Sequence, residues 1–389
     1  MQKIILRKNE ERRIFNGHLW IFSNEIEKKE SEIQSGETVL INDYRGNFIG
    51  YGFYNSNSLI AVRILTRDQK FDLQSLLENR LISAYNFRKS VYPNRDSFRL
   101  VFSESDFIPG LIIDKYNDSY VLQVYSAGVE KNIDLILEVL KQELGAKNIF
   151  TKHDEYFRKL EGLSEENKIY LGNAAEEIIS DGAVKYKVNF EMGQKTGFFF
   201  DQCDNREYLG KFCKDKSVLD CFCNSGGFGL HAAVNGAKNL VFVDSSKEEV
   251  ENVKNNRALN ELVLDAEYVC SDVFDYLERC ISENKKFDVI NIDPPAFAKS
   301  KKNLPKAVKG YEKLNRLAMQ VVREDGLLFS SSCSHHLDKD SFIELIGTAA
   351  AKAKKKAQII YFNSASLDHP SLPAMPETSY LKFIGLRIS

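Results

Sequence analysis

The sequence predicts an α/β chain in which a doubly wound, mostly parallel sheet follows a small β-barrel and a small α+β domain. Strand and helix candidates alternate regularly from about residue 195 onward, which is typical of βαβ units. Short strand candidates separated by turn residues fill the first 70 residues. The stretch between these two regions mixes helices and strands. We therefore expect three domains in the 389-residue chain, at 1–70, 71–190 and 191–389.

The first domain is expected to be a small β-barrel. Residues 37–46 read as a strand that closes in a turn, because Asp43 to Gly46 has good turn chemistry. Two further strands are predicted at 48–54 and 59–65, with the polar residues 55–58 as the turn between them.

The middle domain is expected to be α+β. Apolar residues recur at helical spacing over 72–92, and Pro93 ends that helix. A second helix is predicted at 129–144, with Gly145 as its stop. The strands expected here are 98–102, 110–115, 120–125 and 185–191.

The C-terminal domain is expected to hold seven strands with helices between most of them. The predicted strands are 217–221, 239–243, 267–270, 287–292, 326–331, 358–362 and 380–386. The predicted helices are 228–235, 247–260, 273–284, 306–323 and 339–355. Ligands of such sheets bind beyond the carboxyl ends of the strands, so the residues that follow each strand are the candidates for function.

The composition excludes several classes of protein. No apolar run approaches the ~18 residues of a membrane span, and the N-terminus lacks the pattern of a secretory signal. The seven cysteines show neither disulfide nor zinc spacing. We expect a cytoplasmic protein with reduced thiols, no metal and no membrane partner, and we keep a homodimer among the expected assemblies. A net charge of −2 means that any nucleic acid would be bound through local basic patches.

Acidic residues end three consecutive predicted strands. Asp220 precedes a glycine pair, Asp244 ends the second strand, and Asp272 follows the third. Their order matches the amino acid, ribose and adenine of S-adenosylmethionine, whereas the G-x-G-x-x-G pattern of dehydrogenases is missing. The bland alternative is that Asp220 and Asp272 are helix caps. The cofactor contacts expected along these strand ends are Asp220, Phe222, Asn224, Gly226, Gly227, Asp244, Ser245, Asp272, Val273 and Asp293.

The fourth and fifth strands end in candidate catalytic residues. Asp293 begins an Asp-Pro-Pro-Ala-Phe segment that suits a flat base, with Pro294 and Phe297 beside it. Cys333 ends the next strand, where a thiolate could attack C6 of a pyrimidine and make C5 nucleophilic. A lone cysteine at a strand end is more often structural, and it is the combination with Asp293 that favours a nucleophile. His335 and His336 are candidates, by position only, for the base that removes the C5 proton.

These residues resemble the RlmI-type family of bacterial ribosomal RNA (large subunit) cytosine-C5 methyltransferases. The matching segments are 193–202 (GQKTGFFFDQ), 222–229 (FCNSGGFG), 293–300 (DPPAFAKS) and 332–336 (SCSHH), with 18–22 (HLWIF) and 50–54 (GYGFY) near the N-terminus. The resemblance covers the whole chain. It implies an RNA-binding PUA domain, a middle domain with EEHEE strand order and a class I methyltransferase domain.

The resemblance also assigns residues. It implies that Cys333 is the nucleophile and that 194–202 border the cofactor and the target base. Gln194, Thr196 and Asp201 are then expected to contact S-adenosylmethionine. The expected substrate contacts are Lys195, Arg206, Pro294, Phe297 and Lys299. The chain departs from the family at Cys203 and Cys221, and no cysteine follows Pro295, so the elimination base stays unassigned.

Two other readings stay open at this point. One is a methyltransferase that acts on an exocyclic amine or a ring nitrogen of a purine, since D-P-P-x-F segments occur there without a thiol. The other is an RNA-binding protein with a vestigial methyltransferase fold. In either RNA reading, a lysine run from Lys299 to Lys313 could follow phosphates, although such a run is as often a solvated helix face.

Overall fold

A computed structural model describes residues 1–389 except 30–31, 192, 194 and 299. The described chain forms two compact units, and each is taken by itself below. The first unit holds residues 1–179, 188–200 and 367–378, and the second holds 180–187, 201–366 and 379–389. Each unit is therefore assembled from three separate stretches of the chain. The predicted boundaries at 70 and 190 stay predictions.

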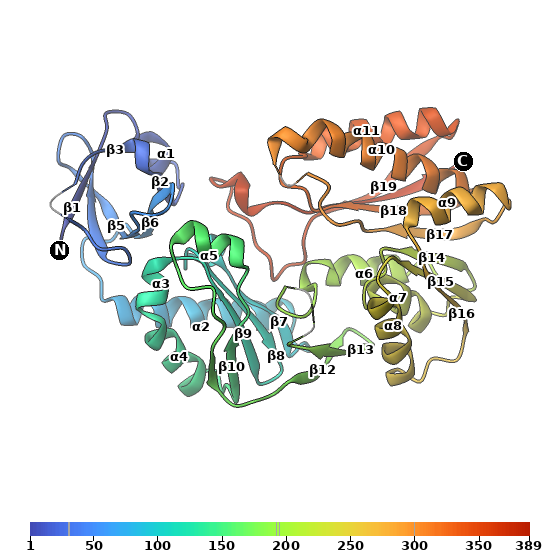
Figure 1. Cartoon of the computed structure of the whole chain (residues 1–389), viewed down its shortest axis with the longest axis horizontal. Helices are drawn as coiled ribbons and strands as arrows, with labels where there is room; N and C mark the ends of the chain where they lie inside the picture. The colour runs from blue at the N-terminus through green and yellow to red at the C-terminus, as the bar shows by residue number, and fades with distance from the viewer. Residues whose placement is uncertain (30–31, 192, 194, 299) are drawn as a thin grey trace. The chain divides into compact units, whose positions relative to one another are not determined.

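The first unit begins with a six-stranded sheet in the order β2-β6-β5-β4-β1-β3, drawn in blue in Figure 1. Its strands are β1 (Lys3–Leu6), β2 (Trp20–Phe22), β3 (Ile26–Lys29), β4 (Thr38–Asn42), β5 (Phe48–Tyr54) and β6 (Ile60–Thr66), with a short helix α1 (Glu11–Phe15). Alternating apolar residues of the strands turn inward to form one core, which includes Ile4, Ile21, Ile41 and Val62. The three strands β1, β2 and β3 were not predicted.

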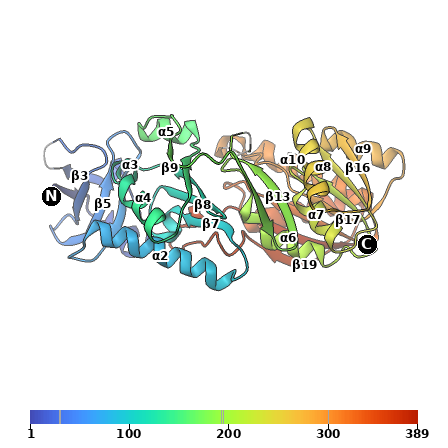
Figure 2. The same cartoon turned by 90° about the horizontal axis from the view of Figure 1, so that it is seen from below.

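A five-stranded sheet follows, in the order β11-β10-β9-β8-β7. Its strands are β7 (Ser97–Phe102), β8 (Leu111–Tyr116), β9 (Ser119–Val124), β10 (Asn148–Thr151) and β11 (Ile169–Leu171), and its helices are α2 (Leu73–Val91), α3 (Ala127–Lys131), α4 (Ile133–Gln142) and α5 (Glu155–Glu161). Helices α2 and α4 lie along this sheet (Figure 2). Three strands precede the helical pair α3–α4, so the strand order extends the expected EEHEE pattern by β7.

Buried polar side chains join the barrel to this α+β part of the first unit. The Trp20 indole donates a hydrogen bond of 2.8 Å to Glu104 Oε1. The Arg63 guanidinium lies between two carboxylates, 3.2 Å from Glu104 and 2.7 Å from Glu161. Because all three charged groups are less than 10% exposed, each needs its partners to remain ionised there. Trp20 thus makes a structural contact within the unit.

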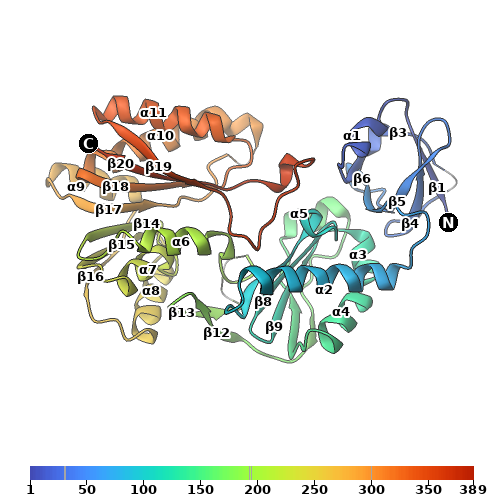
Figure 3. The same ribbon diagram turned by 180° about the vertical axis from the view of Figure 1, so that it is seen from behind.

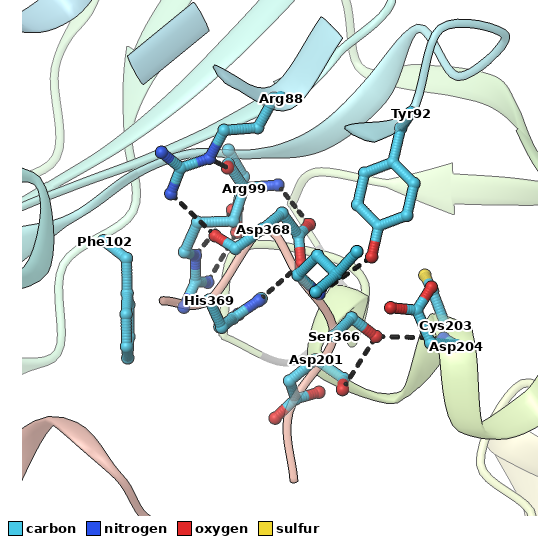
Figure 4. A network of polar contacts seen from close by, with 12 residues as sticks. Arg88, Tyr92, Arg99, Phe102, Asp201, Cys203, Asp204, Ser366, Asp368 and His369 are labelled. Atoms are coloured by element: carbon cyan, nitrogen blue, oxygen red, sulfur yellow. Dashed lines mark hydrogen bonds and ion pairs between the residues drawn. The ribbon is translucent and has the colours of Figure 1, made fainter. Parts of the chain in front are cut away.

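A segment from the C-terminal part of the sequence completes the first unit. Within Leu367–Thr378, which we call the strap, Asp368 is 2% exposed. Its carboxylate accepts a hydrogen bond of 2.9 Å from the Arg99 amide, and its carbonyl accepts one of 2.8 Å from the Arg88 guanidinium (Figure 4). Further along, Met375 is fully buried in the core of the barrel. The strap is therefore anchored in the first unit through a few buried residues, Asp368, His369 and Met375.

The second unit contains a seven-stranded sheet in the order β16-β15-β14-β17-β18-β20-β19. The strands are β14 (Ser217–Cys221), β15 (Asn239–Asp244), β16 (Asp265–Cys270), β17 (Phe287–Ile292), β18 (Val322–Ser332), β19 (Ala357–Asn363) and β20 (Lys382–Ile388). The first five run parallel, and β20 is antiparallel to both β18 and β19. All seven predicted strands are present, and the doubly wound fold is confirmed.

Helices cover both faces of this sheet (Figure 3). α6 (Cys203–Gly210), α7 (Gly227–Val234) and α8 (Lys247–Leu259) lie on one face, and α9 (Val273–Ser282), α10 (Leu304–Val321) and α11 (Lys339–Ala353) lie on the other. The core under α9 to α11 is built from aliphatic strand residues and from the apolar faces of these helices. A two-stranded ribbon, β12 (Glu176–Asp181) with β13 (Val184–Asn189), precedes this sheet in the sequence.

No helix in the described part of the chain is long and apolar enough to span a bilayer. Within the same residues, no group of three or more His, Cys, Asp or Glu side chains is arranged to hold a metal ion.

Candidate active site

The carboxyl ends of four neighbouring parallel strands meet at one edge of the seven-stranded sheet. Cys221 at the end of β14 pairs with Val243 of β15 on one side and Ile292 of β17 on the other. Ile292 pairs in turn with Ser330 of β18. The register therefore brings the loop after Cys221 to the same edge as Asp244, Asp293 and Cys333. The sequence pattern had predicted this gathering.

The loop after β14 has an unusual backbone. Phe222 and Asn224 have φ angles of 59° and 46°, and Gly226 has 89°. Left-handed conformations are costly for residues with a side chain, and they cluster at ligand sites. The loop is held in this form because the Cys223 amide donates to Val243 O at 3.1 Å and the Asn224 amide donates to Asp244 Oδ2 at 3.0 Å.

Asp220 lies beneath this loop and not at its surface. It is 1% exposed. Its Oδ2 accepts a hydrogen bond of 2.8 Å from the Gly229 amide, and its Oδ1 accepts one of 2.9 Å from the Asn291 side chain. A Cβ at Gly229 would stand 2.1 Å from the Phe242 ring, so the glycine is needed for helix α7 to pack on β15. Asp220 was expected to contact a ligand, but in the structure it supports the loop. This role is close to that of a helix cap, which was the alternative for this residue.

Replacing Asp220 with asparagine is expected to remove a pH dependence of stability. Burial raises the pKa of Asp220 from 3.8 to about 7. Between these values the folded chain keeps a proton that the unfolded chain loses, so wild-type stability falls as the pH rises from about 4 to 7. Each pKa unit is worth about 1.4 kcal/mol, so the free energy of unfolding should fall by on the order of 4 kcal/mol more in the wild type than in Asp220→Asn.

Urea unfolding of both proteins between pH 4 and pH 8 measures this difference. Two pH profiles that run parallel would contradict it, because they would mean that Asp220 ionises in the folded chain as it does in the unfolded one.

Asp244 and Asp272 differ in their surroundings. Asp244 is half-buried, and its two oxygens accept hydrogen bonds of 3.0 Å each from the amides of Asn224 and Ser246. Asp272 is exposed and caps helix α9, with Oδ1 accepting from the amides of Phe274 and Asp275. The alternative role of Asp272 as a helix cap is therefore present in the structure. Next to these carboxylates, Ser245 is exposed and Val273 is buried.

Asp293 is half-buried at the end of β17 and belongs to a chain of amide contacts. Gln202 donates a hydrogen bond of 3.0 Å to Asp293 Oδ1, and its own oxygen accepts one of 2.7 Å from Asn205. Burial raises the pKa of Asp293 to about 7, and the negative charge of Asp201 adds to this. The carboxyl can therefore hold or release a proton near neutral pH, as a group that serves as a general acid or base requires.

Cys333 lies against the backbone of the Asp-Pro-Pro loop. Its Sγ is 3.9 Å from Pro294 O, and the residue is half-buried. The Ser334 hydroxyl accepts a hydrogen bond of 3.2 Å from the Ala298 amide and lies 3.0 Å from the Tyr311 hydroxyl. The Tyr311 ring also packs 4.5 Å from the ring of Phe297. The two candidate catalytic strand ends are thus tied together, while His335 and His336 are exposed.

Several residues expected at the site lie elsewhere. Arg206 is 3% exposed, and its guanidinium donates to Asp181 Oδ2 at 2.8 Å and to Cys203 Sγ at 3.1 Å. Arg206 therefore has a structural role, and we do not include it among the proposed substrate contacts. Asp201 is buried, and its Oδ2 accepts a hydrogen bond from Tyr380.

Residues 193 and 195–200 belong to the first unit. Thr196 is buried, and its hydroxyl donates to Asp114. Lys195 is exposed, with its ammonium 4.8 Å from the Phe199 ring centroid. The other two expected contacts, Gln194 and Lys299, lie outside the described residues. Of the neighbouring lysines, Lys313 is paired with Glu278 at 2.9 Å.

Sequence reasoning missed the residues that support the catalytic pair. Asn205 and Tyr311 carry no motif of their own, and Ser334 lies in the matching segment 332–336 without a role assigned to it. The only signal was that Ser334 stands beside Cys333 in the run Ser330–Ser332, Cys333, Ser334, where small hydroxyl residues can satisfy a backbone that leaves a sheet.

Comparison with known proteins gives the same architecture. A PUA-like domain family matches residues 4–67, and the family called Conserved hypothetical protein 95 matches 197–358. Ribosomal RNA large subunit methyltransferase I of Tolumonas auensis is 36% identical, over 99% of this chain and 98% of its own length. The protein of the same name from Aeromonas hydrophila is 37% identical, over 99% and 98%. The chain belongs to the ribosomal RNA large subunit methyltransferase I family.

Another relative and two solved structures agree with this membership of the family. A protein of Methanocaldococcus jannaschii, named as a candidate ribosomal RNA large subunit methyltransferase, is 41% identical over 96% of both chains. Among solved structures, a candidate SAM-dependent methyltransferase from Streptococcus mutans covers all of both chains with a TM-score of 0.84 at 21% identity. Another candidate methyltransferase, complexed with SAH, reaches 0.85 at the same identity and full coverage. These likenesses confirm the fold, with a PUA-like domain before a methyltransferase domain.

Proposed function

We propose that this chain transfers a methyl group from S-adenosylmethionine to C5 of a cytosine in large-subunit ribosomal RNA. The observation that carries the proposal is the approach of Cys333 to the Asp-Pro-Pro loop, beside a strained loop at the same sheet edge. Membership of the ribosomal RNA large subunit methyltransferase I family supports the RNA substrate and the class of reaction. The target nucleotide within the RNA is left open.

The residues around the strained loop fit S-adenosylmethionine. The two oxygens of Asp244 each take one backbone amide, so each keeps a lone pair for a ribose hydroxyl. The left-handed residues Phe222 and Asn224 expose backbone where the methionine end would lie. Asp272, which is exposed at the start of α9, offers a carboxylate for adenine. When bound, S-adenosylmethionine supplies an electrophilic methyl group.

Cys333 activates the base in this proposal. Its thiolate adds to C6 of cytosine, forming an S–C6 bond and moving the electron pair of the C5–C6 double bond toward C5. C5 can then accept a methyl group, which leaves one proton too many on that carbon. Removal of the C5 proton returns its electron pair to the ring and breaks the S–C6 bond, which frees the thiolate. The base that takes this proton is unassigned, and His335 and His336 remain its candidates.

Asp293 neutralises the negative charge that develops on the cytosine ring during these steps. Because its pKa is about 7, its carboxyl can carry a proton at neutral pH and donate it to N3 of cytosine as Cys333 adds. Gln202 donates to Oδ1 at 3.0 Å and Ser331 also hydrogen-bonds this carboxyl, so the group is held in a fixed position at the end of β17. Phe297, packed on Tyr311, provides an aromatic ring next to the Asp-Pro-Pro loop for the extruded nucleotide.

The test is a methylation assay on large-subunit ribosomal RNA with isotope-labelled S-adenosylmethionine, followed by nucleoside analysis. The expected product is 5-methylcytidine. In parallel, RNA that contains 5-fluorocytidine should be trapped as a covalent adduct, because fluorine cannot leave C5 as the proton does. The adduct should map to Cys333 by peptide mass and should be missing in Cys333→Ala.

Two results would contradict the proposal. A labelled purine nucleoside with no covalent adduct would favour methylation of an amine or a ring nitrogen. No binding of S-adenosylmethionine at millimolar concentration, measured by calorimetry, would favour an RNA-binding protein with a vestigial fold.

A further inference from the structure

A lysine that the mechanism does not yet use lies next to the proposed nucleophile. Lys382 is the first residue of β20, and the antiparallel register places it opposite Ser332 of β18. Cys333 directly follows Ser332, the last residue of β18. Lys382 is 7% exposed, and its Nζ donates hydrogen bonds of 2.7 Å to the carbonyls of Ser334 and Tyr380. Its ammonium is therefore fixed at the point where the chain carries Cys333 out of the sheet.

The burial of this ammonium is not explained by an ion pair. Among the described residues no carboxylate lies within salt-bridge distance of Lys382, and two neutral carbonyls hold it instead. Burying a charge without a counter-charge is costly. Burial accordingly lowers the pKa of Lys382 to about 8, while the negative charges of Cys333 and Asp338 favour the ammonium. A buried lysine held by the carbonyl of the residue that follows the candidate nucleophile is an arrangement that packing alone does not require.

We propose that Lys382 is a positioning residue that stabilises the thiolate of Cys333 through its ammonium charge. The inference rests on the proposed function, in which that thiolate attacks the base, and it adds the group that prepares the thiolate. A positive charge close to a thiol favours its ionised form, as it does in other reactive cysteines. The hydrogen bonds to Ser334 and Tyr380 fix the position of this charge without a carboxylate that would cancel it.

The other titratable groups near the pair do not replace Lys382. Asp338, exposed after the end of β18, and Tyr311 of α10 contribute negative charge or none. His335 is exposed, with its ring 5.4 Å from the ring of Tyr380. The thiolate is therefore expected to be favoured while Lys382 is protonated, and this support is lost as the pH rises past about 8.

The test measures how fast iodoacetamide alkylates Cys333 as a function of pH, in the whole protein without RNA. Five other cysteines are buried and Cys270 is exposed, so a Cys270→Ser background isolates the signal, and peptide mass assigns it. Three variants separate charge from packing. Lys382→Gln keeps donors but removes the charge, Lys382→Met removes both, and Lys382→Arg keeps the charge.

We expect Lys382→Gln and Lys382→Met to alkylate Cys333 about tenfold more slowly than the parent at pH 7 and equally fast at pH 10. Lys382→Arg should stay within about threefold of the parent at both values. Equal rates at pH 10 also show that the thiol of Cys333 is equally accessible in the variants and in the parent. A misfolded variant would alkylate at a different rate at this pH. Calorimetry with S-adenosylhomocysteine checks that each variant still folds its cofactor domain.

An unchanged pH profile in both Lys382→Gln and Lys382→Met would overturn the inference. So would slowing by the same factor at pH 7 and pH 10, because that pattern reports packing and not charge. Alkylation does not need the RNA reaction. A shifted profile therefore supports the role of Lys382 even if no 5-methylcytidine forms, and a failure here leaves the covalent adduct with 5-fluorocytidine as the separate test of the proposed function.

Discussion

Cys333→Ala should lower the rate of methyl transfer to RNA by on the order of 10⁴-fold, since no other group can form the bond to C6. The affinity for S-adenosylmethionine should change less than about threefold, because the residues proposed to hold the cofactor lie at or just after the ends of β14, β15 and β16, whereas Cys333 follows β18. Single-turnover assays with labelled cofactor measure the first quantity, and calorimetry measures the second. A large loss of rate without a loss of cofactor binding is the pattern expected of a nucleophile.

Cys270→Ala is the matched control for this loss. Cys270 ends β16 at the same sheet edge but is exposed, and its Sγ lies 3.5 Å from the backbone carbonyl of Ser245. Its replacement should leave the rate within about threefold. If Cys333→Ala also stayed within tenfold of the wild type, the covalent route would be excluded and an amine or ring-nitrogen acceptor would take its place.

Asp293→Asn should lower the rate constant of methyl transfer by about 10²- to 10⁴-fold and change its pH dependence. In the wild type, the pKa of about 7 means that the carboxyl loses its proton above neutral pH. The rate should therefore fall as the pH rises through 7, and this fall forms a descending limb in the pH profile. The asparagine amide can still meet Gln202, but it has no proton to lose, so the limb should vanish. Profiles of kcat/KM between pH 5.5 and 9.5 measure it.

Asp201→Asn provides a control with a defined sign. The charge of Asp201 helps to raise the pKa of Asp293, so its removal should make Asp293 ionise more easily. The falling limb should move to lower pH, while it should vanish in Asp293→Asn. A limb that stayed in place in both variants would assign it to another group and contradict the role of Asp293.

The sheet edge could be predicted from sequence because parallel topology alone determines it. Once five strands are known to alternate with helices, their carboxyl ends must gather, and Asp244, Asp293 and Cys333 gather with them. The sequence pattern did not show how deeply each carboxylate is buried. Asp220 and Asp244 both follow apolar strand residues, yet Asp220 is buried under the loop and Asp244 is half-buried. Which side of a loop a carboxylate faces depends on packing, such as that of Phe242 on Gly229.

The partners of the catalytic pair were beyond sequence reasoning for a related reason. Lys382 reaches Ser334 only because β20 inserts antiparallel between β18 and β19. Arg206 was expected to contact the substrate, but it is buried and Asp181 of the ribbon β12–β13 neutralises its charge. The short strands β1, β2 and β3 lack the apolar alternation of longer strands, and turn-forming and charged residues lie around them. The sequence pattern therefore did not predict them as strands.

The strap has a practical consequence for anyone who wants to cut this protein into pieces. A fragment ending near residue 190 would lack Asp368 and Met375, so the Arg99 amide would lose its acceptor and the barrel would lose a core side chain. A fragment starting there would carry the strap with nothing to pack it. Expression of either half alone should yield aggregation-prone material, and a better dissection would replace 367–378 by a short glycine-serine linker in the C-terminal piece.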